Sequence, residues 1–332
     1  DIIRVAVLLP FLDNKNKGQK EKMTEFYEGF LLGVKELKEK KYNAEVYVFD
    51  IGTENDTKKL ESLLGTSEMN GLDFVVGGVS NQQIDALSRF SKKTGTKYII
   101  PFGTKSRAVA SNPYIFQATT SPSSLYDRVS TAFIDHFKDR NIVFVSEKGS
   151  DNNKNDFVAE LKKALTKENI AFKTQGPTEN LTKELKSKLS TSLPNMIIPT
   201  SSSDKTLSRL FYYLQAIDNP NVSLFGYPEW QTYTHQHNQF HKYDTYLYSI
   251  FYLDDKEYKV QNLKEQYKYW YNKNIINSYP RFAFLGYDIA TYFMTAVHKY
   301  GPNFENNIHE VHVPVLQAAT CFERENNNGG DI

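Results

Sequence analysis

The segment DFVVGGVSNQQIDALSRFSKK, residues 73–93, contains the pattern on which the predicted fold rests. Its apolar run, Phe74–Gly77, is followed by a glycine-containing turn, which is typical of a buried strand that ends abruptly. From Asn81 onward the segment has the pattern of a helix. In a parallel sheet each helix carries the chain back to the start of the next strand. Residues 73–93 therefore predict one βα unit of an α/β fold.

The same alternation extends along the chain in both directions. With 332 residues, and roughly 150 residues per domain, the chain is long enough for about two domains. Strands are expected at residues 4–9, 44–50, 74–77, 97–101, 114–117, 141–146, 171–174, 195–200, 223–226 and 247–253. Helices are expected at residues 24–40, 56–67, 81–93, 123–137, 155–168, 181–190, 204–217 and 284–300, and polar loops or a frayed end at residues 13–22, 149–155 and 326–331. We expect two α/β lobes, one of which absorbs the C-terminal part, because that part has too few strands for its own sheet.

The composition argues against several classes of protein. Lys and Arg number 40 and Asp and Glu number 39, so the net charge of +1 provides no field that attracts nucleic acid or an anionic membrane. The single cysteine, Cys321, excludes an intramolecular disulfide and a multi-cysteine metal site. The longest apolar run, residues 5–12, is far shorter than the roughly 20 residues that span a bilayer. We therefore expect no nucleic-acid partner and no direct membrane insertion of this chain.

Candidate ligand-binding residues of the first lobe follow its predicted strands. In open parallel sheets, ligands bind beyond the carboxyl ends of the strands, beside the first amides of the next helices. Phe11 follows the first strand, Ser80 follows Gly77-Gly78-Val79, and Thr104 follows Pro101-Phe102-Gly103. The hydroxyls of Ser80 and Thr104, with nearby amides, can hold an anionic group. A structural role stays open for both residues, since a hydroxyl at such a position also caps a helix, which contributes about 1 kcal/mol.

The second lobe offers a carboxylate between aromatic residues. Glu229 comes just after a predicted strand, between Tyr227 and Trp230. A carboxylate there can pair with a ligand ammonium, and an aromatic ring can supply a stacking or cation–π face. The alternative is a structural turn with a solvated glutamate and a core tryptophan. The loops at residues 147–149 and 200–203 are further candidates, because they also follow predicted strands.

No metal site, cofactor or catalytic centre is predicted. His235, His237 and His241, with Asp244, have a spacing that can ligate zinc or copper, but their polar, tyrosine-rich segment is typical of a protein surface. The sequence lacks a G-x-S-x-G elbow, a Walker A loop, a G-x-G-x-x-G turn and an H-E-x-x-H helix. Cys321 is expected to be a structural thiol. We therefore expect a protein that is not an enzyme.

Five segments resemble the type I periplasmic-binding fold, and in particular the branched-chain amino-acid receptor group of solute-binding proteins. They are Val5-Ala-Val-Leu-Leu-Pro-Phe11, Phe74-Val-Val-Gly-Gly-Val-Ser80, Tyr98-Ile-Ile-Pro-Phe-Gly-Thr104, Tyr114-Ile-Phe-Gln-Ala-Thr-Thr-Ser121 and Phe225-Gly-Tyr-Pro-Glu229. The resemblance covers nearly the whole chain. It implies two Rossmann-like lobes with parallel sheets joined by three crossovers. The implied N-terminal lobe is residues 1–118 plus 251–321, the C-terminal lobe is residues 119–250, and residues 322–332 form the third crossover and a frayed end.

The resemblance also implies roles for individual residues. Ser80 and Thr104, with the backbone of Phe102 and Gly103, match the positions that grip the α-carboxylate and amine of an amino acid. Glu229 matches the acidic position that faces the ammonium group. Phe11, Tyr227 and Trp230 are expected to line the same interlobe cleft.

The function implied by the resemblance is non-catalytic binding of a solute in the bacterial envelope. A small polar ligand, an amino acid or a related compound, is captured as the lobes hinge shut, and a membrane permease or a cell-wall component is the expected partner. The alternative is the same fold with a lost or repurposed cleft, acting in protein assembly or cell-wall scaffolding. The sequence also resembles Bacteroidota envelope proteins in which such a module follows LysM repeats. Because a core strand is expected within three residues of Asp1, a signal or upstream domain is expected to lie outside this sequence.

Overall fold

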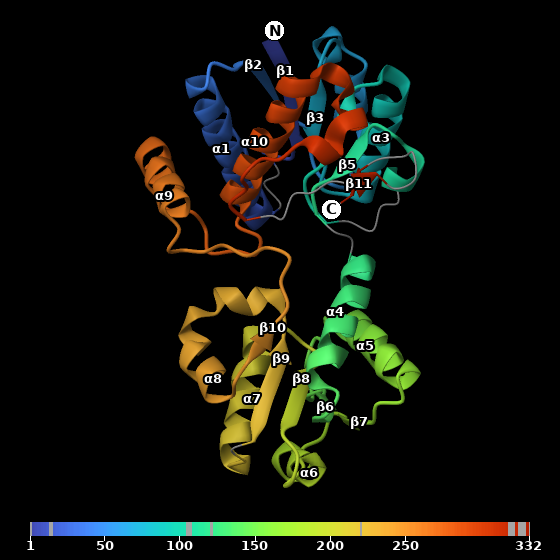
Figure 1. Cartoon of the computed structure of the whole chain (residues 1–332), viewed down its shortest axis with the longest axis vertical. Coiled ribbons are helices and arrows are strands. Elements are labelled where there is room, and N and C mark those ends of the chain that lie inside the picture. Colours follow the sequence, from blue (N-terminus) through green and yellow to red (C-terminus); the bar gives the residue numbers. More distant parts are fainter. Residues whose placement is uncertain are drawn as a thin grey trace. The chain divides into compact units, whose positions relative to one another are not determined.

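The chain divides into two compact units, each with its own sheet. The structure, a computed structural model, describes residues 2–12, 16–103, 108–119, 122–219, 221–317, 323–324 and 330–331. The first lobe comprises Asp1–Pro122 and Ile250–Ile332, and the second lobe comprises Ser123–Ser249 (Figure 1). Within each lobe, helices lie on both faces of a largely parallel sheet. The predicted α/β class with two parallel-sheet lobes is confirmed.

The first lobe has a sheet with the strand order β11-β12-β5-β4-β3-β1-β2. Its strands are β1 (Ile2–Leu9), β2 (Asn43–Asp50), β3 (Phe74–Gly77), β4 (Lys97–Ile100), β5 (Ile115–Gln117), β11 (Glu323–Arg324) and β12 (Gly330–Asp331). Its helices are α1 (Lys17–Glu39), α2 (Lys58–Leu64), α3 (Asn81–Thr94), α9 (Tyr258–Tyr271) and α10 (Phe282–Tyr300), with 3₁₀ turns at Ser67–Met69, Ala108–Ser111 and Gly301–Glu310.

Two separate cores cover the faces of this sheet. Along β1, Val5 and Val7 point toward α1 and α10, whereas Ala6 and Leu8 point toward α2 and α3. Successive side chains of a strand point to opposite faces, so a strand that is covered on both sides is apolar at every position. This explains the unbroken apolar run at the start of the sequence.

Helix α1 begins earlier than the sequence pattern indicates. Residues 13–22 were expected to form a loop, but α1 starts at Lys17 and its cap is Asn16, whose Oδ1 accepts the N–H of Gln19 at 3.1 Å. The first turns of α1 are mostly exposed. They therefore lack the apolar spacing by which a helix is recognised in a sequence, and the asparagine cap was the available signal.

Helices α1 and α10 lie side by side and cross where both have glycine (Figure 1). A Cβ atom built on Gly29 would lie 1.9 Å from the carbonyl oxygen of Ala283, and one built on Gly286 would lie 2.0 Å from that of Phe26. Both distances are too short for a methyl group. The two backbones are therefore in contact at this crossing, with no room for a side chain from either helix.

A buried ion pair joins β4 to the turn after α10. Lys97 Nζ lies 3.1 Å from Glu305 Oε1, and the side chains are only 4% and 8% exposed. The ammonium also donates to the carbonyl of Gly95 at 3.3 Å and lies 4.7 Å from the centre of the Tyr114 ring. The second oxygen of Glu305 has no hydrogen-bond partner among the described residues. Each charge of this pair therefore depends on the other for compensation.

A buried carboxyl group fastens the loop before α10 to α1. Glu25 is 1% exposed, and its carboxyl oxygens accept the N–H of Ile276 at 2.7 Å and that of Ala283 at 3.4 Å. Burial raises the pKa of Glu25 from 4.5 to about 7, although the two N–H donors and Lys273 oppose this shift. Glu25 therefore changes its charge near neutral pH in the folded protein.

The raised pKa of Glu25 predicts a stability that decreases with pH. Between pH 4.5 and 7 the unfolded chain loses this proton while the folded chain keeps it, so the free energy of unfolding should fall by about 2 kcal/mol from pH 5 to pH 7. Urea unfolding at both values should show this component in the wild type and in the exposed control Glu21→Gln. It should be missing in Glu25→Gln. A Glu25→Gln variant with the same pH dependence as the wild type would contradict the assignment.

The second lobe has a sheet with the strand order β10-β9-β8-β6-β7. Its strands are β6 (Asn141–Val145), β7 (Phe172–Gln175), β8 (Asn195–Pro199), β9 (Val222–Gly226) and β10 (Tyr246–Leu247). Its helices are α4 (Pro122–Phe137), α5 (Asn155–Lys167), α6 (Leu181–Lys188), α7 (Asp204–Ile217) and α8 (His237–Lys242), with 3₁₀ turns at Pro228–Thr232 and Thr234–Gln236. Helices α4 and α5 lie on one side of the sheet and α7 on the other (Figure 1).

The predicted strand at residues 247–253 is largely wrong. Only Tyr246 and Leu247 pair with β9, and the chain then continues without regular structure apart from a single bridge residue, Phe251. Tyr248 stacks on Phe157 in the core of the second lobe, with ring centres 5.1 Å apart, whereas Phe251 is buried in the core of the first. The segment is apolar because its side chains enter two cores, and not because it forms a strand.

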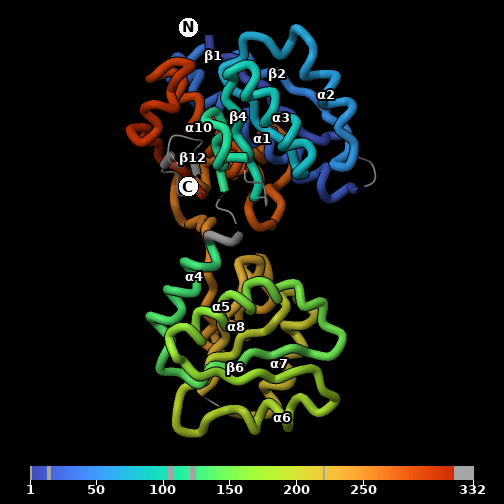
Figure 2. The backbone as a smooth tube through the Cα atoms, turned by 90° about the vertical axis from the view of Figure 1, so that its right-hand side faces the viewer, coloured from blue at the N-terminus to red at the C-terminus, as the bar shows by residue number. Residues whose placement is uncertain are grey.

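The C-terminal segment extends the first sheet. A third crossover was expected in residues 322–332, but β11 and β12 pair with each other, and Gly330 of β12 pairs with Phe116 of β5. The described part of this segment thus belongs to the sheet of the first lobe. The tube in Figure 2 shows α10, from the C-terminal part of the chain, within the same lobe as β1 and β4.

Candidate functional site

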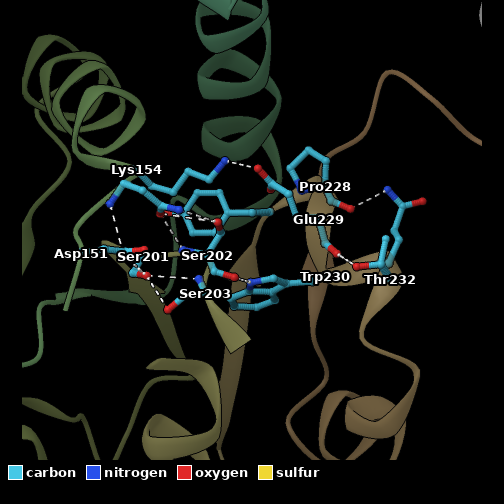
Figure 3. Close-up of polar contacts among 12 residues, drawn as sticks. Asp151, Lys154, Ser201, Ser202, Ser203, Pro228, Glu229, Trp230 and Thr232 are labelled. Carbon is cyan, nitrogen blue, oxygen red and sulfur yellow. Dashed lines mark hydrogen bonds and ion pairs between the residues drawn. The ribbon is translucent and has the colours of Figure 1, made fainter. Parts of the chain in front are cut away.

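Two loops of the second lobe are tied together at the carboxyl ends of β6 and β8 (Figure 3). Asn153 Oδ1 accepts the N–H of Ser202 at 2.9 Å, and Asn152 Oδ1 accepts the hydroxyl of Thr200 at 2.6 Å. The backbone N–H of Lys154 donates to the carbonyl of Thr200 at 3.0 Å. Because each loop supplies acceptors to the other, protein contacts alone order both loops.

The serine run of the second loop takes part in this network. Ser203 Oγ accepts the N–H of Thr206 at 3.3 Å and so caps α7. Ser201 Oγ donates to Asp151 at 2.5 Å, and Ser202 Oγ accepts the side-chain amide of Asn153 at 3.1 Å. An anionic group that binds at the start of α7 therefore has to share hydroxyls that already have partners.

Glu229 forms an ion pair with a lysine that the sequence analysis did not single out. Lys154 Nζ lies 2.5 Å from Glu229 Oε1 (Figure 3) and 5.2 Å from the centre of the Tyr227 ring. The Glu229 side chain is 39% exposed and that of Lys154 is 13% exposed. Glu229 Oε2 is buried and has no hydrogen-bond partner among the described residues. The carboxylate at this position is thus already neutralised by the protein.

The aromatic residues beside Glu229 belong to the core. Tyr227 and Trp230 are both 0% exposed. The Tyr227 hydroxyl donates to the carbonyl of Pro199 at 2.5 Å, and Trp230 Nε1 donates to the carbonyl of Ser202 at 3.0 Å. Side chains of the second lobe cover both rings in this structure, and the role of the two residues in lining a ligand stays a prediction. The two rings support the loop that carries Glu229.

In the loop that directly follows β6, the charge of Glu147 is also compensated by a residue of the second lobe. Glu147 is 4% exposed, and Arg209 of α7 donates from Nε to its Oε2 at 2.8 Å and from Nη2 to the carbonyl of Lys148 at 3.2 Å. Burial raises the pKa of Glu147, while the Arg209 guanidinium opposes that shift. Residues 147–149 are therefore anchored to α7.

In the first lobe, Ser80 caps α3. Its Oγ accepts the N–H of Gln83 at 3.3 Å and donates to the carbonyl of Glu54 at 2.7 Å. Gln83 is fully buried, and its side chain accepts the N–H of Val79 at 3.0 Å. The N–H of Gly78 donates to the carbonyl of Leu8 at 3.0 Å. The structural role left open for Ser80 is present, and two amides expected to face a ligand have protein partners.

The other candidates of the first lobe lie at the ends of β1 and β4. Phe102 is partly buried, and its ring packs against Phe26 and Phe282, with centres 5.3 and 5.5 Å apart. Phe11 is also partly buried and packs edge-on against Tyr27 at 5.7 Å. Gly103 is exposed.

Thr104 lies outside the described residues, as do Ser121 and Cys321. The ligand role of Thr104 therefore stays a prediction.

The histidine cluster is spread over a polar surface. His235 Nε2 lies 2.9 Å from Asp204 Oδ1, and His237 and His241 lie in α8. Within the described ranges, no group of three or more His, Cys, Asp or Glu side chains has the arrangement of a metal site. The same residues include no helix that is long and apolar enough to cross a membrane.

The sequence analysis missed residues 151–154, which contribute most to the loop network of the second lobe. The run Asp-Asn-Asn-Lys was taken as a solvated loop because it is polar throughout. Its position was the available signal, since it lies between β6 and α5 at the carboxyl end of the sheet. Polar residues at that edge indicate a candidate site as well as the serine run after β8 does, and that run was among the candidates.

Comparison with known families identifies the chain. The family model described as "Receptor family ligand binding region" matches residues 28–322. The chain belongs to this family. The match spans both lobes and covers the loops that follow β3, β4, β6, β8 and β9, whereas the loop after β1 lies before it. No curated protein sequence matches the chain.

Solved structures of several bacterial proteins have the same fold as this receptor-family region. A putative branched-chain amino acid ABC transporter protein from Rhodospirillum rubrum is 13% identical with a TM-score of 0.72, over 99% of this chain and 95% of that one. An ABC transporter substrate-binding protein from Desulfitobacterium hafniense in complex with Leu is 13% identical over the same shares, with a TM-score of 0.61. The substrate-binding protein LivJ from Streptococcus pneumoniae, in complex with isoleucine, is 16% identical over 100% and 94%, with a TM-score of 0.58. The type I periplasmic-binding fold is thus confirmed.

Proposed function

We propose that this chain is a non-catalytic solute-binding module, which captures a small polar ligand, an amino acid or a related compound, and closes on it by a hinge movement. The observation that carries the proposal is the ordered set of polar loops at the carboxyl ends of β6, β8 and β9, in a chain that belongs to a ligand-binding family. Parallel sheets bind ligands at that edge. The ligands named for two structural neighbours, Leu and isoleucine, support a ligand of similar size.

The proposal keeps the residue roles that the resemblance implies. Ser80 and Thr104, with the backbone of Phe102 and Gly103, would hold an anionic group. Glu229 would face the opposite end. Phe11, which lies at the end of β1, would contribute an apolar contact.

The proposed setting is the periplasm or cell envelope, where the module would deliver its ligand to an ABC permease. The transporter proteins among the structural neighbours support this setting. A cell-wall partner and a link to LysM repeats stay predictions. A scaffolding role without a ligand is the alternative function.

A thermal-shift screen against amino acids, hydroxy acids, dipeptides and cell-wall fragments tests ligand binding. A ligand present at 100 times its Kd stabilises the folded state by about 2.7 kcal/mol, so a true ligand should raise the Tm by several degrees. Glu229→Gln should reduce that rise, measured from the variant's own Tm. Glu160→Gln, which alters an exposed glutamate of α5, should leave it unchanged.

Two outcomes of the screen would change the proposal. If no compound raises the Tm of the wild type, the scaffolding role replaces solute binding. If a ligand raises the Tm of wild type and Glu229→Gln equally, the module binds solutes but Glu229 does not contact them.

A further inference from the structure

Helix α9 lies at the edge of the first lobe, next to α1, and its end carries four aromatic residues (Figure 1). Tyr267 is buried and Tyr271 is half-buried, and the hydroxyls of both donate to Glu28 of α1. Tyr269 and Trp270, in contrast, are 80% and 55% exposed. Packing of α9 against the lobe therefore accounts for two of these rings and not for the other two.

A groove between α1 and α9 leads to the two exposed rings. It consists of one hollow of about 290 Å³, which includes Lys259, and one of about 400 Å³, which includes Trp270. Three polar residues line both hollows and so join them into one α1–α9 groove: Lys35, Asn262 and Gln266. From residue 259 to residue 270 the groove extends about 16 Å along the helix, at 1.5 Å per residue. That length accommodates a ligand of several linked rings.

The exposed rings offer flat apolar surface at one end of this groove. The ring centres of Tyr269 and Trp270 are 5.4 Å apart, and the ring planes are perpendicular. In this arrangement each ring keeps at least one face that the other does not cover. Exposed Trp and Tyr side chains that lie together are typical of binding surfaces, where they supply most of the contact energy.

The charges along the groove balance one another. The described lining includes two lysines and three glutamates: Lys35, Lys259, Glu36, Glu39 and Glu265. Lys35 Nζ lies 2.7 Å from Glu39 Oε1, and Glu36 is neutralised from outside the lining by Lys40, also at 2.7 Å. A surface of this kind provides no net field that attracts an anion or a cation. The groove therefore favours a ligand without net charge.

Between its ends the groove is polar. The aliphatic residues among its described lining, Leu32 and Leu263, are only 6% and 5% exposed. A protein partner docks through an apolar centre, and the lining described here has none between the rings and Lys259. The amides of Asn262 and Gln266 can instead donate and accept hydrogen bonds along the groove.

We propose that the α1–α9 groove binds an uncharged oligosaccharide. A sugar ring has an apolar C–H face, which would stack on Trp270 or Tyr269. Its hydroxyl groups would form hydrogen bonds with Asn262, Gln266 and Glu265. Both features of the ligand thus have a counterpart in the groove. All of these residues belong to the first lobe, so the inference does not depend on the proposed solute-binding function.

Tryptophan fluorescence tests the proposal at the site itself. The chain has two tryptophans, and Trp230 is fully buried in the second lobe, so acrylamide quenches mainly Trp270. The probes are the uncharged tetrasaccharides maltotetraose, cellotetraose, mannotetraose and chitotetraose. A probe that binds should reduce the quenching of Trp270 by about 2-fold, because a stacked sugar covers one of the two faces of the ring.

Variants assign the contacts when they are titrated calorimetrically with the same probe. Trp270→Ala should weaken binding by about 10-fold, which corresponds to about 1.4 kcal/mol. Asn262→Ala should weaken it by about 2- to 10-fold, the usual range for one hydrogen bond. Trp270→Phe keeps an aromatic face and should retain most of the affinity. Tyr212→Ala removes a ring that is 71% exposed on α7 of the second lobe, and it should leave the affinity unchanged.

Three results would overturn the inference. The first is that no probe reduces the quenching of Trp270. The second is that a probe binds wild type and Trp270→Ala equally, which would place the sugar elsewhere. The third is that quenching falls as the protein concentration rises without sugar, which would make the two rings an interface between copies of the chain. The proposed solute site is tested separately, because Glu229→Gln should leave the binding of sugar to the groove unchanged.

Discussion

Lys97→Met should destabilise the folded chain by about 3 to 5 kcal/mol, because it leaves the carboxylate of Glu305 buried without its counter-charge. That side chain is 8% exposed, and its second oxygen has no hydrogen-bond partner among the described residues. Water therefore cannot replace the lysine without opening the contact between β4 and the turn after α10. Urea unfolding followed by far-ultraviolet circular dichroism measures the loss.

Two further variants separate the buried charge from other causes. Lys97→Met combined with Glu305→Leu removes both charges and should recover most of the lost stability, since apolar residues of similar size can replace a buried ion pair. Lys35→Met breaks a pair with Glu39 on the exposed face of α1 and should cost less than about 1 kcal/mol. If the double variant is no more stable than Lys97→Met alone, the loss comes from packing and not from the unpaired charge.

Gly29→Ala should destabilise the folded chain by about 3 kcal/mol, the upper end of the usual cost of overpacking. The added methyl group would lie 1.9 Å from the carbonyl oxygen of Ala283, so α1 and α10 would have to move apart. Moving them apart would also loosen the packing of Phe26 and Phe30 against α10. The Tm of the variant should therefore fall by several degrees in a thermal unfolding experiment.

Gly18→Ala is the matched control, because it adds the same methyl group to the same helix. The nearest atom to its Cβ would be Asn16 Oδ1 at 3.9 Å, which is an ordinary contact. Alanine also favours helix more than glycine does, so Gly18→Ala should be neutral or stabilising by up to about 1 kcal/mol. Equal losses from both substitutions would show that the helix crossing is not the cause.

Helices and strands were predictable where the apolar pattern of the sequence matches the burial of the side chains in the structure. The apolar run Phe74–Gly77 became β3 with the same bounds, because a strand covered on both faces leaves a clear signal. The first turns of α1 were missed because an exposed helix needs no apolar spacing. Residues 248–253 were taken as strand because burial in two different cores gives the same composition as burial in a sheet.

The candidate site was predictable in position but not in its contacts. Glu229 follows a strand as expected, since that position depends on chain order alone. Its partner, Lys154, comes from another loop, and a sequence pattern does not show which of many lysines lies near a given acid. The burial of Tyr227 and Trp230 depends on which way each ring turns, and this is decided by packing against distant residues such as Phe157 and Phe240.

The division of the first lobe into two chain segments sets the order in which the protein can fold during synthesis. The second lobe is one continuous segment, Ser123–Ser249, and all of it is translated before α10. The contact between Glu25 and Ala283 joins residues 258 positions apart, so α1 stays without its covering helix until α10 has been translated. The nascent first lobe therefore exposes the apolar face of α1 and β1 for most of translation, and a ribosome-associated chaperone would have a binding surface there that the finished protein hides.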